Sequence, residues 1–191
     1  MESKFGRIKV SNNSPVIVIF SLMCVVAFFI NGMTQGTANR ALFSVYRAPL
    51  TDPFTYVRMF GHIFGHANWN HLISNLTLIL VVGPLLEEKY GSRNMIIVIV
   101  VTALITGLVN YTFFPSVRLL GASGVAFAFV LLSPFTNMKQ GYIPITFILV
   151  VVIYLGGQVY EGLFVRNNIS NITHIIGGII GAVLGYRMQK E

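Results

Sequence analysis

The sequence predicts an all-α membrane protein: a single domain over residues 1–191, built as a bundle of six transmembrane helices with a long, partly membrane-embedded first loop. Of the 191 residues, 54% are hydrophobic and only 10% are charged, against about 25% charged in an average soluble domain. The mean hydropathy is +0.73. The apolar residues form runs close to the roughly 20 residues that cross a bilayer as a helix, at 15–31, 69–86, 94–114, 123–137, 142–158 and 171–188.

The first run, at 15–31, follows a short basic segment, as the apolar part of a signal peptide does. Because further spans follow and the run is long enough to cross, we interpret it as a retained helix and residues 1–14 as a cytoplasmic N-terminal segment. The single cysteine, Cys24, lies inside this run, so an internal disulfide is excluded and a packing role is expected.

The connection at 32–68 is much longer than the other four. A long loop in a compact protein is usually functional or contains structure of its own. Apolar side chains such as Phe54, Met59 and Phe60 are interleaved with Arg58 and His62. We therefore expect short interfacial helices in this loop.

Basic residues predict how the bundle is oriented. The formal net charge is +7, but the basic residues lie at the ends of the spans, where they orient helices and meet anionic lipid, so we do not expect nucleic-acid binding. With six spans, the side that holds both termini carries more of them (Lys4, Arg7, Lys9, Lys89, Arg93, Lys139, Arg187, Lys190) than the other (Arg40, Arg47, Arg58, Arg118, Arg166). The positive-inside rule then predicts cytoplasmic termini and an outward-facing loop at 32–68.

The fourth run begins with Gly121-Ala122-Ser123-Gly124. A serine hydroxyl in hydrocarbon needs a polar partner, and the flanking glycines leave room for one. From Ser123 to the turn at 135–137 the helix is roughly 20 Å long, shorter than the hydrocarbon core of about 30 Å. Ser123 is therefore predicted to lie about 10 Å below the outer surface, in a cavity that protein encloses and water reaches.

The sixth run places His174 at the same predicted depth, again roughly 20 Å from its cytoplasmic end. Gly177, Gly178 and Gly181 follow on the face that carries the histidine, and Ala182 and Gly185 continue it. Such a stripe lets two backbones approach closely. Alone it favours plain helix packing with a buried histidine. The shared face and the matched depth instead favour packing against the fourth run, around Ser123, Ala126 and Val130, which brings the imidazole to the hydroxyl.

A serine and a neutral histidine are sufficient for nucleophilic acyl transfer, because the imidazole can take the hydroxyl proton. No carboxylate is well placed to orient His174, because the acidic residues lie in loops or at the cytoplasmic side, as Asp52, Glu87 and Glu161 do. We therefore predict a Ser–His dyad rather than a triad, with the ring of His174 oriented by packing against Phe127, one turn below Ser123.

An oxyanion needs hydrogen-bond donors. The backbone N–H of Ser123 lies at a helix N-terminus, where the dipole favours negative charge. His71 and Asn75 are i and i+4, so they share a face near the outer end of the second span. For Asn75 alone, an interhelical hydrogen bond is an equal alternative.

A metal site is the other chemistry that the histidines raise, since His62 and His66 are also i and i+4. Zinc needs three or four His, Cys or carboxylate ligands, and the sequence has no H-E-x-x-H. We predict no metal and no cofactor. His62 and His66 are interpreted as structural residues that hydrogen-bond the loop backbone to the second span.

Taken together, these motifs strongly resemble the rhomboid intramembrane serine proteases. The resemblance covers essentially all six spans, in order. G-x-S-G alone is a weak signal, and its combination with H-x-x-x-N before it and H-x-x-G-G-x-x-G after it makes the resemblance specific. The residues that carry it are His62, His66, His71, Asn75, Gly121, Ser123, Gly124 and His174 with Gly177, Gly178 and Gly181.

The resemblance implies an endopeptidase in which Ser123 is the nucleophile, His174 is the general base, and His71, Asn75 and the Ser123 amide form the oxyanion hole. It implies transmembrane protein substrates cut near their outer ends within the lipid bilayer, and the fifth helix with the loop after it as a mobile gate. It also implies the minimal six-helix form, without a seventh helix, and a structural role for Glu87. We expect a bacterial plasma membrane as the setting, because the sequence shows no transit peptide and no soluble extension.

The chain departs from the family pattern at two positions. Val57-Arg58 stands where the family often has Trp-Arg, which affects how the loop sits in lipid, and Phe127 stands where tyrosine is common, so the ring keeps its stacking surface without a hydroxyl.

Two alternatives compete with the protease. A rhomboid-like pseudoprotease that binds transmembrane clients would lack Ser123 or His174, and a small transporter would show inverted repeats, which the sequence lacks. The sequence indicates no oligomeric state.

Overall fold

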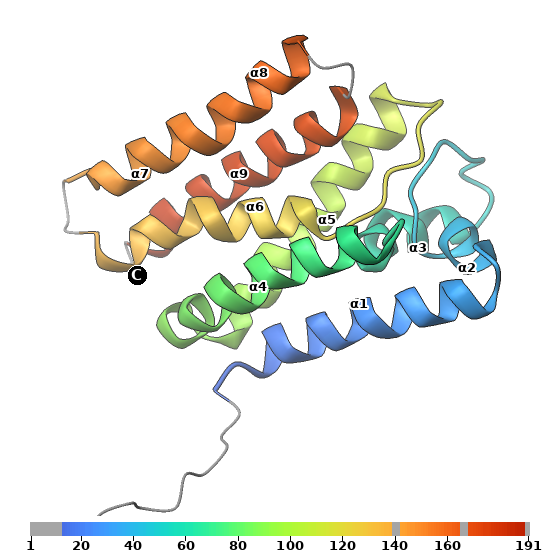
Figure 1. Ribbon diagram of the computed structural model, residues 1–191, viewed down its shortest axis with the longest axis horizontal. Coiled ribbons are helices and arrows are strands. Elements are labelled where there is room, and N and C mark those ends of the chain that lie inside the picture. Colours follow the sequence, from blue (N-terminus) through green and yellow to red (C-terminus); the bar gives the residue numbers. More distant parts are fainter. Residues whose placement is uncertain (1–12, 139–141, 165–167, 190–191) are drawn as a thin grey trace, which may run out of the picture.

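The computed structural model describes residues 13–138, 142–164 and 168–189. Within these ranges the chain is helical, with one isolated antiparallel bridge between Val45 and Leu119 and no named strand. The prediction of an all-α fold is confirmed. The helices in Figure 1 are α1 (Pro15–Met33), α2 (Thr37–Ala41), α3 (Phe54–Gly61), η1 (His62–Phe64), α4 (Trp69–Tyr90), α5 (Ser92–Phe113), α6 (Ser123–Leu132), η2 (Ser133–Asn137), α7 (Ile145–Val150), η3 (Val151–Leu155), α8 (Gly156–Phe164) and α9 (Asn168–Met188).

A helix occupies each apolar run that the sequence indicates. Three of them, α1, α4 and α5, are long and apolar enough to cross a membrane by length and composition. Helix α6 begins at Ser123, as predicted, and continues as the 3₁₀ turn η2. The fifth run differs from the prediction of 142–158: it begins at Ile145, because Pro144 is extended, and passes through the π-helical segment η3 into α8.

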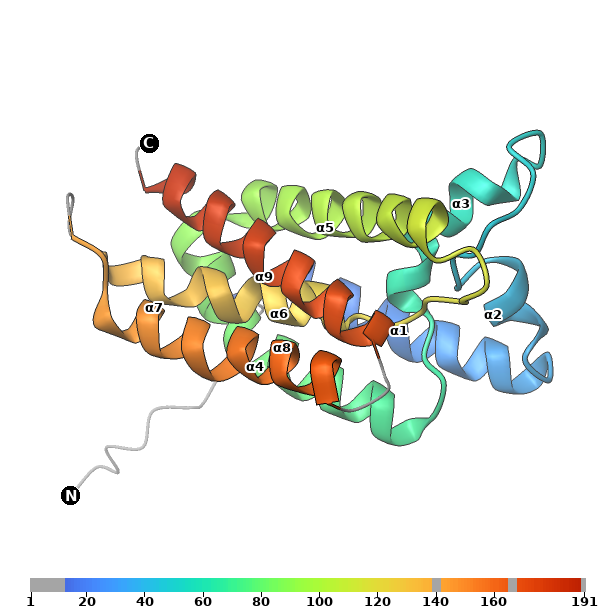
Figure 2. The ribbon, with the colours of Figure 1, turned by 90° about the horizontal axis from the view of Figure 1, so that it is seen from above.

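Helix α6 lies at the centre of the bundle, with α4, α5 and α9 packed around it (Figures 1 and 2). Every residue from Gly124 to Leu132 is buried. A helix that is apolar all round is stable only where other elements cover all of its faces. The central position therefore places the first turn of α6, with Ser123, inside the protein rather than against its surroundings.

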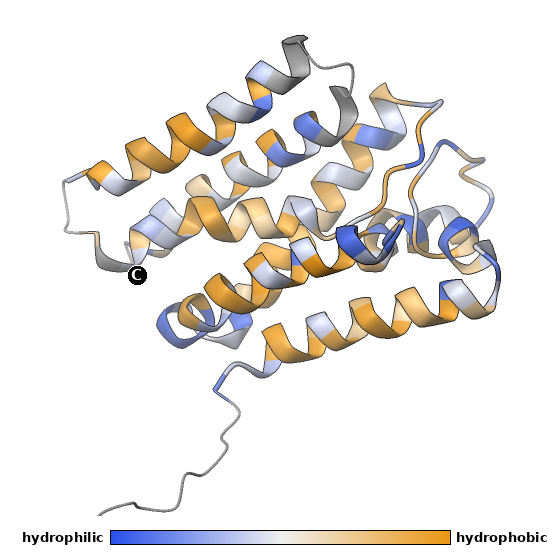
Figure 3. Cartoon of the chain, viewed as in Figure 1, coloured by the Kyte–Doolittle hydropathy of each residue, from blue (hydrophilic) through white to orange (hydrophobic). Residues whose placement is uncertain are grey.

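The outer helices are rich in apolar residues (Figure 3), and many of their apolar side chains are exposed. Exposed examples are Leu22 on α1, Val81 on α4, Val100 on α5 and Val152 on η3. So many exposed apolar side chains are unsuited to water and suited to lipid. Together with the three long apolar helices, it identifies a membrane protein.

The long loop at 32–68 contains α2, α3 and η1, so the expectation of short helices is confirmed. The loop is fastened to the end of α5. Val45 and Leu119 exchange backbone hydrogen bonds of 2.9 Å, and the Asn110 amide donates to the carbonyl of Val45 at 3.1 Å. Inside the loop, buried Arg58 donates to Asp52 at 2.7 Å, and this bond holds the pKa of the Asp52 carboxyl below its usual range.

Glu87 joins the second predicted span to the first. Its two carboxylate oxygens accept the backbone N–H groups of Val16 and Ile17, each at 3.0 Å, and Oε1 also accepts the Ser92 hydroxyl at 2.6 Å. The first amides of a helix have no intrahelical acceptor, and a negative charge there is favourable. Glu87 thus caps α1 from a neighbouring helix, which agrees with a structural role for this acid.

Part of the predicted topology falls outside the described residues. Residues 1–12 of the predicted N-terminal segment lie there, as do several of the basic residues that orient the bundle (Lys4, Arg7, Lys9, Lys139, Arg166 and Lys190).

Candidate functional site

Ser123 is the first residue of α6, and its backbone N–H is one of the four amides at a helix start that lack an intrahelical acceptor. The residue before it, Ala122, provides no side-chain cap. The serine side chain is partly exposed, whereas the rest of α6 is buried. The hydroxyl therefore lies beside the first amides of α6, where the helix dipole favours negative charge.

Gly121 brings the second predicted span to this helix start. Its φ of +131° is one that residues with a side chain rarely adopt, and its N–H donates to the carbonyl of His62 at 2.9 Å. A Cβ here would lie 2.7 Å from Cε1 and 2.8 Å from Nε2 of His71, and 3.7 Å from Nδ2 of Asn75. The imidazole of His71 and the amide of Asn75 thus pack directly on the backbone two residues before Ser123.

The orientation of the Asn75 amide is fixed by His66. The imidazole Nδ1–H donates to the carbonyl of Phe64 at 3.1 Å, so Nε2 is the acceptor, and it receives an N–H of Asn75 at 3.1 Å. The second N–H of the same amide is then available to another acceptor. The rings of His66 and His71 lie edge to face, with centroids 5.1 Å apart.

His174 reaches the turn of α6 that carries Ser123. Its ring stacks on Phe127 with centroids 4.3 Å apart and an interplanar angle of 3°. Phe127 is four residues after Ser123, hence one turn along the same face. The predicted stacking is confirmed.

Small residues allow this approach. A Cβ at Gly177 would overlap the carbonyl of Gly124, and a Cβ at Gly181 would overlap the carbonyl of Ala128. Gly178 faces Leu155 and Leu131. The glycine stripe of α9 does pack on α6, as predicted, but its nearest neighbours there are Gly124 and Ala128. The prediction of Ala126 and Val130 was wrong, because the closest backbone approach selects the face of α6 with the smallest side chains.

The sequence reasoning missed Gln158. Its Oε1 lies 2.6 Å from Nδ1 of His174. An amide oxygen only accepts, so Nδ1 carries the proton and Nε2 carries the lone pair that a base needs. The available signal was an amide at the end of an otherwise apolar run, since polar residues at membrane depth are usually functional. Orientation of the ring thus comes from a hydrogen bond as well as from packing.

His62 differs from the prediction in its partner. Its Nε2–H donates to the carbonyl of Ala103 on α5, at 3.1 Å, rather than to α4. Its own carbonyl accepts from Gly121. His62 therefore links the first loop, the third predicted span and the loop before Ser123. His66 connects the loop to α4 through Asn75, as expected for a structural histidine.

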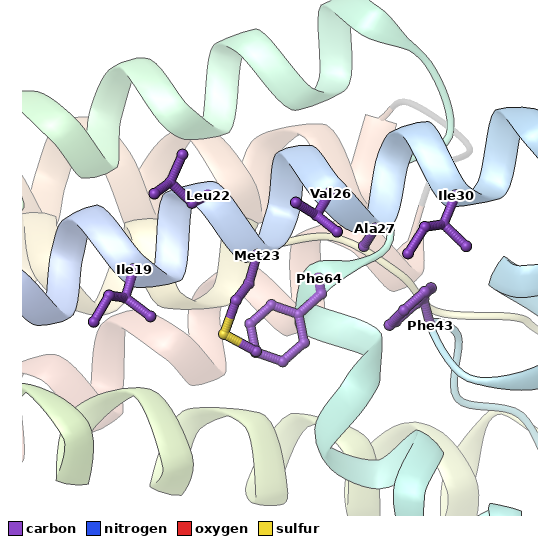
Figure 4. Close-up of a pocket in the computed structure, with 8 residues that line it drawn as sticks. All are labelled: Ile19, Leu22, Met23, Val26, Ala27, Ile30, Phe43 and Phe64. Carbon is purple, nitrogen blue, oxygen red and sulfur yellow. The ribbon is translucent and has the colours of Figure 1, made fainter.

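A separate groove lies on the lipid-facing side of α1 (Figure 4). It has a volume of about 290 Å³, and its lining is apolar and contains none of Ser123, His174, His71 and Asn75. The lining residues are Ile19, Leu22, Met23, Val26, Ala27, Ile30, Phe43 and Phe64. A groove without polar groups can pack acyl chains but cannot polarise a reacting group.

In this arrangement His174 stacks on Phe127, one turn from Ser123, and His71 and Asn75 pack on Gly121, two residues before Ser123. A hydroxyl, an imidazole and hydrogen-bond donors are groups that acyl transfer through an oxyanion uses. Comparison with known protein families gives a match over much of the chain. Residues 53–191 match the family described as Rhomboid domain.

Three relatives illustrate the similarity. Rhomboid-like protein 11, chloroplastic, of Arabidopsis thaliana is 28% identical over 142 residues, which cover 66% of this chain and 50% of the relative. Rhomboid protease GlpG of Salmonella paratyphi A is 27% identical over 179 residues, 90% of this chain and 62% of the relative. Rhomboid protease GlpG of Haemophilus influenzae is 23% identical over 186 residues and 94% of both chains. The chain thus spans half to about three fifths of the length of the first two.

Proposed function

Because this chain belongs to the rhomboid family, we propose that it is an intramembrane serine endopeptidase that cleaves transmembrane protein substrates near their outer ends with a Ser123–His174 dyad. The observation that carries the proposal is the stacking of His174 on Phe127, one turn from Ser123. General-base activation requires the imidazole within hydrogen-bond reach of the hydroxyl, and a histidine stacked one turn from a partly exposed serine supports that approach.

In the proposed reaction, Oγ of Ser123 attacks the carbonyl carbon of the scissile peptide bond while Nε2 of His174 takes the hydroxyl proton. The resulting tetrahedral oxyanion collapses, the C–N bond breaks, and the imidazolium gives the proton to the leaving amine. Water then attacks the acyl-enzyme with His174 again as the base, and the proton returns to Oγ as the acid product leaves.

The oxyanion receives its hydrogen bonds from the Ser123 amide, from the free N–H of Asn75 and from His71. The contact of Gly121 with both side chains supports this assignment, because it brings them to the backbone that leads into Ser123. Donors fixed before the reaction stabilise the developing charge without reorganisation. The hydrogen bond from Asn75 to His66 serves the same end by holding the amide in one orientation.

The setting of the reaction is part of the proposal. The helices cross the membrane six times, with both termini in the cytoplasm of a bacterial cell and the first loop outside. The short α6, covered by α4, α5 and α9, supports a site below the outer surface that water reaches through the protein and not through lipid.

Covalent labelling tests the proposal. The purified protein is incubated in detergent with a fluorescent fluorophosphonate, which reacts with an activated serine. The wild type should form an adduct, and Ser123→Ala and His174→Ala should not. Ser133→Ala, at the far end of the same helical segment, is the matched control and should label normally. Cleavage of a single-span substrate in liposomes should follow the same pattern.

The outcomes separate the competing functions. A wild type that neither labels nor cleaves any of a panel of single-span proteins, yet binds them, would identify a pseudoprotease. Asn75→Ala should retain labelling but lose about 10²–10³-fold in turnover, the usual effect of one oxyanion donor. Unchanged turnover in that variant would remove Asn75 from the oxyanion hole.

A further inference from the structure

The continuous helix formed by α7, η3 and α8 contributes two side chains to the rings at the site. The Tyr154 ring meets Phe127 edge to face, with centroids 5.9 Å apart and an interplanar angle of 80°. Gln158 accepts from Nδ1 of His174 at 2.6 Å. The two residues are i and i+4, so they lie on one face of this helix. The stacked pair, with Phe127 on α6 and His174 on α9, is therefore contacted by side chains from a third helix.

The Gln158 contact decides which nitrogen of His174 can act as a base. In a neutral imidazole one nitrogen carries a proton and the other a lone pair, and the hydrogen bond made by one nitrogen selects the form. A glutamine oxygen opposite Nδ1 keeps the proton there. Nε2 is then the acceptor, as the transfer of a proton from Oγ of Ser123 requires.

We infer that Gln158 is the positioning residue of the general base, with the role that a buried carboxylate has in a Ser–His–Asp triad. The inference rests on the proposed function and goes beyond it, because the site becomes a Ser–His–Gln relay whose third member comes from α8. A neutral amide selects the tautomer and the ring orientation, as a carboxylate does, without placing a charge at membrane depth.

The stacking of His174 on Phe127 and its hydrogen bond to Gln158 restrict the imidazole in different ways. Stacking on Phe127 fixes the plane of the imidazole but does not distinguish the two ring orientations related by a half-turn about the Cβ–Cγ bond. A hydrogen bond at Nδ1 selects one of these orientations and so defines the direction of Nε2. Phe127 and Gln158 therefore act together on the position of Nε2.

Two substitutions at Gln158 test the inference. Gln158→Met keeps the length of the side chain but removes the strong acceptor, and Gln158→Glu restores one. Val159→Ala, at an exposed neighbouring position on the same helix, is the control. In Gln158→Met we expect kcat and the rate of fluorophosphonate labelling to fall about 10–100-fold, the usual effect of losing a partner that orients a histidine, with KM unchanged. Gln158→Glu and Val159→Ala should stay within a few-fold of the wild type.

A measurement that does not depend on catalysis accompanies the kinetics. Nitrogen-15 NMR of histidine-labelled protein, with the His174 signals assigned by their loss in His174→Ala, reports which ring nitrogen is protonated. We expect the Nδ1–H form in the wild type and in Gln158→Glu, and a shift toward Nε2–H in Gln158→Met. The spectrum also verifies that each variant is folded.

The results distinguish this inference from the proposed function. A wild type with the Nδ1–H form but no labelling would refute the proposed function, and the tautomer shift in Gln158→Met would still support the contact. A folded Gln158→Met protein that labels and cleaves at the rate of the wild type, or that keeps the Nδ1–H form, would overturn the positioning role.

Discussion

Replacing Gly121 by alanine should disable the site through one methyl group. The new Cβ would lie 2.7 Å from Cε1 and 2.8 Å from Nε2 of His71, whereas carbon atoms in contact are about 3.5–4.0 Å apart. The imidazole must therefore retreat by roughly 1 Å. The φ of +131° adds strain, because L side chains are rarely found there, at a cost of about 1–3 kcal/mol.

The predicted result is a folded protein with lower stability and about 10²-fold lower kcat, because a misplacement of about 1 Å at a reacting centre has effects of that size. The assay is cleavage of a single-span substrate in liposomes, with kcat referred to the fraction of protein that is folded. Gly91→Ala is the matched control. Gly91 also has a positive φ, of +79°, but a Cβ there meets nothing within 4 Å among the described residues. It should lose stability and keep its kcat.

A double variant separates strain from contact. Gly121→Ala with His71→Ala removes the ring that the methyl group meets, so part of the lost stability should return while turnover stays low. If Gly121→Ala alone folds and cleaves as fast as the wild type, the packing of His71 on the Gly121 backbone has no part in the chemistry.

Three further predictions concern the scaffold. Glu87→Gln leaves one α1 amide facing an N–H donor instead of an acceptor, so thermal unfolding in detergent should show a loss of about 1–3 kcal/mol, with kcat of the folded protein unchanged. Gly181→Ala inserts a methyl group against a carbonyl of α6 and should destabilise by about 1–3 kcal/mol, whereas Gly32→Ala, with open space around it, should be neutral or stabilising. The Asp52 pKa is lowered mainly by the Arg58 hydrogen bond, so the stability difference between wild type and Asp52→Asn should be present above the usual aspartate pKa and vanish as the pH falls through the lowered one.

The sequence predicted what depends on one helix at a time. The start of α6 at Ser123 follows from its glycines and the apolar run, and the glycine stripe follows from helical periodicity. The sequence could not predict how α9 and α6 are rotated against each other. The choice of Gly124 and Ala128 over Ala126 and Val130 depends on which face of α6 the other helices leave to α9.

The same limit explains Gln158. Its predicted span was apolar, and nothing local indicates that residue 158 faces a residue sixteen positions later in the chain. The partner of His62 was missed for a related reason, since the sequence does not indicate whether a loop histidine bonds to α4 or, as here, to the carbonyl of Ala103 on α5. Contacts of this kind depend on tertiary geometry, and the apolar pattern contains no information about them.

A short helix at the centre of a membrane bundle begins with backbone N–H groups that have no acceptor within the helix, and the proposed site uses these groups. In the proposed setting, the start of α6 leaves amides without intrahelical acceptors at a depth where lipid cannot satisfy them. Loop residues hold the groups next to these amides: the carbonyl of His62 accepts from the N–H of Gly121, and His66 holds Asn75. The donors that remain are directed to where an oxyanion forms in the proposed reaction. The short helix, the polar loop and the proposed oxyanion hole thus form one structural feature, and in the proposed function the loop at 32–68 belongs to the active site as much as the helices do.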